Sequence, residues 1–154
     1  MPEIPICAFI VSIVALRQCD GEWQVLLLKR SQSLVGAWCQ VAGKIKEKET
    51  GWQAAVRELK EETGLVPDTL YSADFCEQFY EADRDSITMA PVFVAIVGKD
   101  ANVTLNEEHS DYRWMTFEEA KELVAFGGQR QMLRWIETEF VQREPSKHLL
   151  IECA

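Results

Sequence analysis

The stretch Gly43–Leu65 reads GKIKEKETGWQAAVRELKEETGL, and it decides how the rest of the chain is interpreted. We predict a helix over Thr50–Thr63, because a good capping residue opens this segment and a glycine follows it. At about 100° per residue, Glu58, Glu61 and Glu62 share one side of that helix. Three carboxylates on one side repel each other, unless a cation such as Mg²⁺ lies among them. These three residues alone also fit a solvated helix surface.

The spacing over the whole stretch favours the cation. Gly43 is followed after five residues by Glu49, and after seven more by Arg57-Glu58-Leu59-Lys60-Glu61-Glu62-Thr63-Gly64-Leu65. This is, without departure, the motif Gly, five residues, Glu, seven residues, Arg-Glu-aliphatic-any-Glu-Glu-any-Gly-aliphatic. The chain therefore resembles the Nudix hydrolase family. The segment Trp38–Gly43 (WCQVAG) is similar to the Trp-Gln-x-Val-Thr-Gly of dihydroneopterin triphosphate and dATP pyrophosphatases, within the MutT-like enzymes.

The resemblance implies one Nudix domain over residues 1–154, with the α/β (α+β) fold of an α/β/α sandwich around a mixed central sheet. It also implies an enzyme in which water cleaves a phosphoric anhydride bond of a nucleoside diphosphate joined to another group. Mg²⁺ would be the cofactor, and Mn²⁺ would substitute for it because both ions take oxygen ligands. We expect a nucleoside or pterin triphosphate as substrate, with a dinucleoside polyphosphate or nucleotide sugar as the alternative. A domain that binds nucleotides without catalysis is a further alternative, although the motif glutamates are intact.

The family motif also implies roles for individual residues. The expected metal ligands are Glu58, Glu61, Glu62, the carbonyl of Ala42 and, at the edge of the set, Glu49. Arg57 is expected to pair with Glu49 and to orient the ligands.

The expected general base is Glu61, Glu62 or an acidic residue of the loop that precedes Trp114. Glu108 fits that position best and Glu107 next, but the loop also fits a solvated turn. His109 fits a surface or hydrogen-bonding role better than that of a base.

Phosphate groups that no metal holds require cationic donors. Arg30 is the first candidate and Lys29 the second, at the end of a predicted strand, and Lys44 is weaker. Solvated side chains explain these positions nearly as well. Stacking against a base requires aromatic rings, for which the candidates are Trp38, Tyr80, Phe79 and Phe126. Core packing is the competing explanation, and for Trp38 the better one.

Composition limits the partners. The chain has 154 residues and a net charge of −9, which opposes binding to nucleic-acid backbones and anionic membranes. Its five cysteines are odd in number and have no CxxC spacing, so we expect free thiols in a reducing, cytoplasmic compartment. The expected partner is a small nucleoside diphosphate derivative, and a homodimer is left open.

Hydrophobic patterning predicts strands, a helix, further strands and two more helices. The predicted strands are Cys7–Arg17, Trp23–Arg30, Trp38–Val41, Tyr71–Tyr80, Ser86–Val97 and Tyr112–Met115. Thr116 is expected to cap the second helix, and Gln129–Gln142 to form the last. The tail His148–Cys153 fits either a strand or a loose end.

Overall fold

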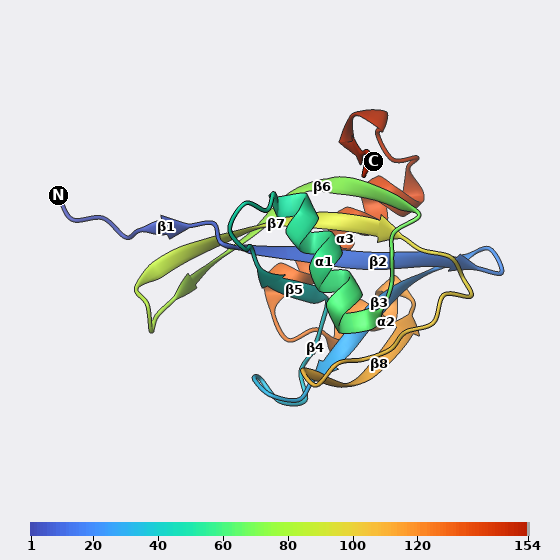
Figure 1. Cartoon of the computed structure of the whole chain (residues 1–154), viewed down its shortest axis with the longest axis horizontal. Coiled ribbons are helices and arrows are strands. Elements are labelled where there is room, and N and C mark those ends of the chain that lie inside the picture. The colour runs from blue at the N-terminus through green and yellow to red at the C-terminus, as the bar shows by residue number, and fades with distance from the viewer. Residues whose placement is uncertain (154) are drawn as a thin grey trace.

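Helices lie on both faces of one mixed sheet in the computed structural model, which describes residues 1–153 (Figure 1). The strands are β1 (Ile6–Cys7), β2 (Ile10–Cys19), β3 (Glu22–Arg30), β4 (Trp38–Cys39), β5 (Val41–Lys44), β6 (Thr69–Glu81), β7 (Ser86–Ile96), β8 (His109–Met115) and β9 (Leu150–Ile151). The helices are α1 (Gly51–Thr63), α2 (Phe117–Leu123) and α3 (Gly127–Ile136), followed by a π-helical turn, η1 (Glu137–Gln142), and a 3₁₀ turn, η2 (Lys147–Leu149).

Strand β2 is the centre of the sheet. It runs parallel to β7 and antiparallel to β3 and β5, while β6 and β7 form a long antiparallel hairpin. Strand β8 adds to β3, β1 to β7 and β9 to β6. Parallel and antiparallel pairs therefore occur together, and the predicted mixed sheet is confirmed.

Alternation along β2 divides the core into two layers. Val14 and Leu16 point to the face covered by α2 and α3, whereas Ile13 and Ala15 point to the face covered by α1. Each fully buried aliphatic side chain contributes about 1.5–3 kcal/mol to folding, so a one-residue slip of this strand would exchange the two faces at great cost. The result is the expected sandwich, with α1 in front of the sheet in Figure 1 and α3 behind it.

Both predicted ends of α1 are confirmed. The Thr50 hydroxyl accepts a hydrogen bond from the backbone N–H of Gln53, and the Gln53 side chain accepts one in return from the Thr50 N–H. Gly64 ends the helix in the left-handed conformation, with φ of 76°, which a residue without Cβ adopts without strain. The metal-ligand candidates therefore lie on a helix that is fixed at both ends.

Several predicted boundaries were wrong. The first predicted strand is interrupted between β1 and β2, and Trp38–Val41 is split because β4 pairs with β3 while β5 pairs with β2. Helix α3 begins at Gly127. The Gln129 side chain accepts a hydrogen bond from the Phe126 N–H, and this bond stabilises the first turn although it contains glycine.

Towards its end the chain departs from the prediction in one further way and adopts one of two predicted alternatives. The regular α-helix ends at Ile136, and η1 continues it to Gln142. The tail adds β9 to the edge of the sheet. No helix of the described residues is long and apolar enough to cross a bilayer.

Candidate active site

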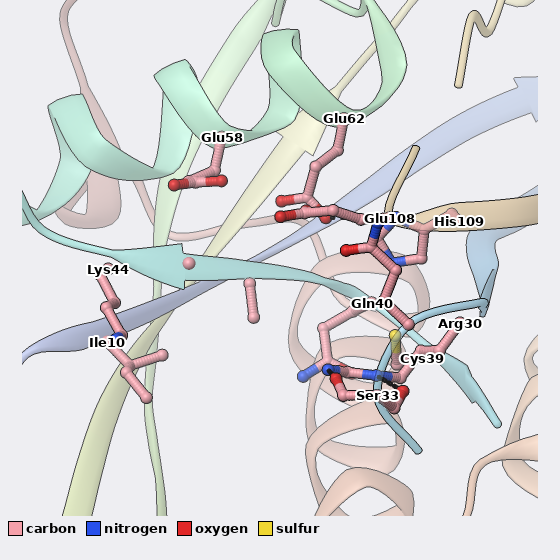
Figure 2. A pocket seen from close by; sticks show the side chains of 13 residues that line it. Ile10, Arg30, Ser33, Cys39, Gln40, Lys44, Glu58, Glu62, Glu108 and His109 are labelled. Atoms are coloured by element: carbon pink, nitrogen blue, oxygen red, sulfur yellow. Dashed lines mark hydrogen bonds and ion pairs between the residues drawn. The ribbon is translucent and has the colours of Figure 1, made fainter. Parts of the chain in front are cut away.

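A cavity of about 460 Å³ opens between α1, β5, the end of β3 and the start of β8 (Figure 2). Loops meet strand ends here, so polar side chains from four separate segments converge on one space. Its lining consists of Ile10, Arg30, Gln32, Ser33, Cys39, Gln40, Ala42, Gly43, Lys44, Glu58, Glu62, Glu108 and His109.

The three glutamates of α1 differ in depth. The side chain of Glu62 is 2% exposed and that of Glu58 15%, and both project into the cavity in Figure 2. Glu61 is 50% exposed and does not line it. Gly43 of β5 faces Glu58 so closely that a Cβ at this position would overlap the carboxyl group. The motif glycine is therefore needed for this close approach.

Arg57 holds the neighbouring carboxylates in place. Its guanidinium donates to both oxygens of Glu49 at 2.7 and 2.9 Å, to Glu58 at 2.8 Å and to the carbonyl of Lys44 at 2.8 Å. A longer bond of 3.2 Å reaches Glu61. Bonds from Arg57 lower the pKa of Glu49 to about 2, so this carboxylate stays ionised. The predicted pair of Arg57 and Glu49 is thus formed in the structure, and it ties α1 to the loop after β5.

Glu62, Glu108 and His109 form a second cluster beside it. One ligand atom from each lies within 4.8 Å of the others. The Oε2 of Glu62 is buried without a hydrogen-bond partner, and so is the Nδ1 of His109. Burial, followed by the hydrogen bond and negative charge of Glu58, raises the pKa of Glu62 to about 9. Burial lowers the pKa of His109.

These features fit a divalent cation with oxygen ligands. A buried carboxylate oxygen without a partner carries a large desolvation cost, which a bound cation would offset. Glu58, Glu62 and Glu108 supply three carboxylates around one cavity, and Ala42 lines the same wall. Mg²⁺ takes such carboxylate and carbonyl oxygens together with water or substrate phosphate.

Of the predicted phosphate-binding cations, Arg30 and Lys44 line the cavity and Lys29 does not. The Nε of Arg30 donates to the carbonyl of Ser33 at 2.8 Å, and its Nη2 donates to the Ser33 hydroxyl. Lys29 has the same parity on β3 as Leu27, which belongs to the core under α2 and α3. Its side chain therefore leaves β3 on the face opposite α1.

The predicted stacking residues lie elsewhere. Trp38 packs against the core under α2 and α3, with the guanidinium of Arg113 5.0 Å from its ring centre. Tyr80 lies on the β6–β7 hairpin and donates to Asp85 at 2.7 Å. Neither residue lines the cavity, nor do Phe79 and Phe126. The structure thus does not bring these four rings to a ligand in this cavity, and for Trp38 the competing explanation of core packing holds.

Sequence reasoning missed two polar residues of the lining. Gln40 is buried between β4 and β5, where its amide donates to Ser12 and Glu77 and accepts from Gln129 of α3. A glutamine inside an apolar run was the available signal. His109 was expected in a surface or hydrogen-bonding role. Strand β8 begins at this residue and pairs it with Arg30 of β3, which buries it.

Comparison with known proteins gives the family. The sequence model of the NUDIX domain matches residues 8–136. The chain belongs to the NUDIX family. The expected Nudix hydrolase, an enzyme acting on phosphoanhydride bonds, is thereby confirmed. Its cluster of Glu62, Glu108 and His109 could hold a divalent metal.

Two curated relatives are similar over most of this chain. An octanoyltransferase of Myxococcus xanthus is 35% identical over 127 residues, a match that spans 80% of this Nudix chain but only 35% of the relative. An asymmetrical bis(5'-nucleosyl)-tetraphosphatase of Caenorhabditis elegans is 28% identical over 124 residues, which is 79% of this chain and 88% of that protein. The second relative is therefore aligned nearly throughout, and the first only in part.

Solved structures have the same fold. The binary complex of a C. elegans Ap4A hydrolase has a TM-score of 0.75 at 24% identity, covering 87% of this chain and 98% of that one. The dihydroneopterin triphosphate pyrophosphohydrolase of E. coli has a TM-score of 0.69 at 24% identity, covering 86% and 96%. At this level of identity the likeness concerns the fold.

Proposed function

We propose that this Nudix hydrolase uses Mg²⁺ to cleave a dinucleoside polyphosphate by attack of water on one phosphorus. The observation that carries the proposal is the meeting, in one cavity, of Glu58, Glu62 and Glu108 with the cations Arg30 and Lys44. Carboxylates of this kind bind metal, and the cations match phosphate oxygens that the metal leaves free. The nearly full-length likeness to a bis(5'-nucleosyl)-tetraphosphatase supports this substrate class ahead of the triphosphates.

The motif residues would divide the work of holding the metal. Glu58 and Glu62 point into the cavity and Ala42 lines it, so these three would be inner ligands. The half-exposed Glu61 would join from the rim, and Glu49 would act by holding Arg57. When bound, Mg²⁺ neutralises phosphate charge and lowers the pKa of a coordinated water.

Side chains of this protein would accept the proton, bind phosphate and orient the metal ligands. Glu108 lies opposite α1 and is exposed, so it can accept the proton of the attacking water. Arg30 is oriented by Ser33 and would bind a phosphate oxygen. Arg57 would orient Glu58, because it bonds that carboxylate at 2.8 Å and the Lys44 carbonyl at the same distance.

A second candidate substrate is a nucleoside or pterin triphosphate. The segment WCQVAG before α1, which is similar to that of the corresponding pyrophosphatases, favours it. Gln40 and Ala42 of this segment also line the cavity. The two candidates differ in length, because the first carries a nucleoside at each end of the phosphate chain.

The test is a comparison of kcat/KM for diadenosine tetraphosphate, dATP and dihydroneopterin triphosphate, with products separated by chromatography. We expect turnover with Mg²⁺ or Mn²⁺, none in excess EDTA, and the highest kcat/KM for the dinucleotide. Full activity in EDTA would exclude the metal mechanism. Higher kcat/KM for a triphosphate would favour the second candidate, and binding without any turnover would favour a non-catalytic domain.

A further inference from the structure

Two buried side chains of the cavity lie close together, and each has a polar atom without a hydrogen-bond partner. The Nδ1 of His109 and the Oε1 of Glu62 are 3.6 Å apart, which is too long for a hydrogen bond. His109 Nδ1 has no other partner, and neither has Glu62 Oε2. The two side chains are only 6% and 2% exposed, so water outside the protein does not satisfy them. Figure 2 shows both beside Glu108 at one end of the cavity.

The spacing of these atoms fits a single cation. Two ligands that each lie about 2.1 Å from one ion are separated by about 3 Å at right angles and about 4.2 Å across the ion. The separation of 3.6 Å falls inside that interval. The corresponding atom of Glu108 lies within 4.8 Å of both, and its side chain is exposed.

We propose that the Nδ1 of His109 is a metal ligand, which binds one divalent cation together with Glu62 and Glu108. The inference rests on the proposed function, because the ion would lie in the proposed catalytic cavity, but it assigns a nitrogen ligand to a set otherwise made of oxygens. One oxygen of Glu108 suffices for this site, and the other stays free to accept a proton.

The nitrogen ligand has a consequence for the choice of metal. Mg²⁺ strongly prefers oxygen, whereas imidazole suits later transition ions and Mn²⁺ accepts both kinds of ligand. The cluster of Glu62, Glu108 and His109 should therefore bind Mn²⁺ and Co²⁺ more tightly than Mg²⁺. If His109 only oriented Glu62 and did not bind the ion, the carboxylates alone would set the order of affinities for these ions.

The direct test uses the fact that the chain has two histidines. In His148→Gln, which changes the exposed histidine of η2, His109 is the single imidazole left. We expect pulsed EPR of the Mn²⁺-loaded, nucleotide-free variant to show ¹⁴N coupling from one coordinated imidazole. Mn²⁺ bound without this coupling would overturn the proposal, and so would a failure of the variant to bind Mn²⁺ at all.

A second test measures selectivity by calorimetry. His109→Asn places an amide group, with an oxygen ligand, near the position of Nδ1. We expect its affinity for Co²⁺ to fall at least about tenfold, while that for Mg²⁺ changes less than about threefold. The matched control His148→Gln should retain both affinities. Equal losses for the two ions in His109→Asn would indicate a structural role and contradict a metal ligand.

Both measurements are made without substrate, so they separate this inference from the proposed function. Nitrogen coordination in a protein that hydrolyses no nucleotide would support the metal ligand and refute the enzyme. If the protein hydrolyses diadenosine tetraphosphate but its bound Mn²⁺ shows no imidazole coupling, the enzyme is supported and the metal ligand is refuted. If His109→Asn does not fold, the EPR measurement still decides, because it leaves His109 unchanged.

Discussion

Replacing Glu62 by glutamine should stabilise the metal-free protein, although it removes a proposed metal ligand. The side chain is 2% exposed, and burial beside Glu58 raises its pKa from 4.5 to about 9. At neutral pH the folded protein therefore keeps a proton on Glu62 that the unfolded chain has released. Stability must fall as pH rises between the two pKa values, since the native state binds more protons than the unfolded state. Glutamine is neutral throughout and removes this dependence.

The size of the effect follows from the pH interval. At pH 7 the solution is about two and a half units above the unfolded pKa and still below the folded one, and each unit corresponds to about 1.4 kcal/mol. Without metal, the free energy of unfolding of Glu62→Gln should therefore exceed that of the wild type by about 3 kcal/mol at pH 7. The difference should shrink to about 1 kcal/mol at pH 5.5.

Urea unfolding in EDTA at pH 5.5, 7 and 8 measures this difference directly. Glu61→Gln is the matched control, because its carboxyl is 50% exposed and a surface substitution usually changes stability by less than about 0.5 kcal/mol. Burial also raises the pKa of Glu77, but this contribution is common to wild type and variant and cancels in the difference.

Mg²⁺ should then largely cancel the effect. An ion at about one hundred times its dissociation constant stabilises the folded state by about 2.7 kcal/mol, and the wild type should gain far more than Glu62→Gln. A pH-independent difference between the two proteins in EDTA would refute the reasoning, as would a glutamine variant that is less stable than the wild type at pH 7.

Three further substitutions test the site. Gly43→Ala should force the carboxyl of Glu58 away from Arg57, so calorimetry should show Mg²⁺ affinity reduced about tenfold or more while the protein stays folded. Arg57→Lys should lower kcat by about 10–100-fold in steady-state assays. It should also flatten acid unfolding between pH 4.5 and 2, because the low pKa of Glu49 contributes stability above its unfolded value that is lost as pH falls toward 2. If Glu108 is the general base, Glu108→Gln should reduce kcat by about 10²–10⁴ with little change in KM, whereas a raised KM alone would indicate a closing loop.

Local sequence patterns were enough to predict α1 and the family. The capping threonine and terminal glycine act within one helical turn, so their effect does not depend on the rest of the fold. The pairing of Arg57 with Glu49 also followed from the motif. A continuous apolar run predicted the first central strand, because both faces of β2 are buried.

The depth of each side chain was decided by tertiary structure. Glu61 and Glu62 are neighbours on one helix side, yet the cavity wall covers one carboxyl and leaves the other half exposed. Lys29 and Arg30 differ only in strand parity and in the irregular register beside β8, and this difference assigns them to opposite faces of the sheet.

The sequence by itself determined the family and the helix that carries the motif glutamates, since the motif lies in one continuous segment. Its partners in the cavity, Arg30, Glu108 and His109, come from two strands and a loop that meet only after β8 pairs with β3. That pairing also buries His109, for which the sequence fitted a surface or a hydrogen-bonding role. Burial and proximity depend on contacts between distant segments, so only the folded chain brings the nitrogen of His109 to 3.6 Å from the carboxylate of Glu62.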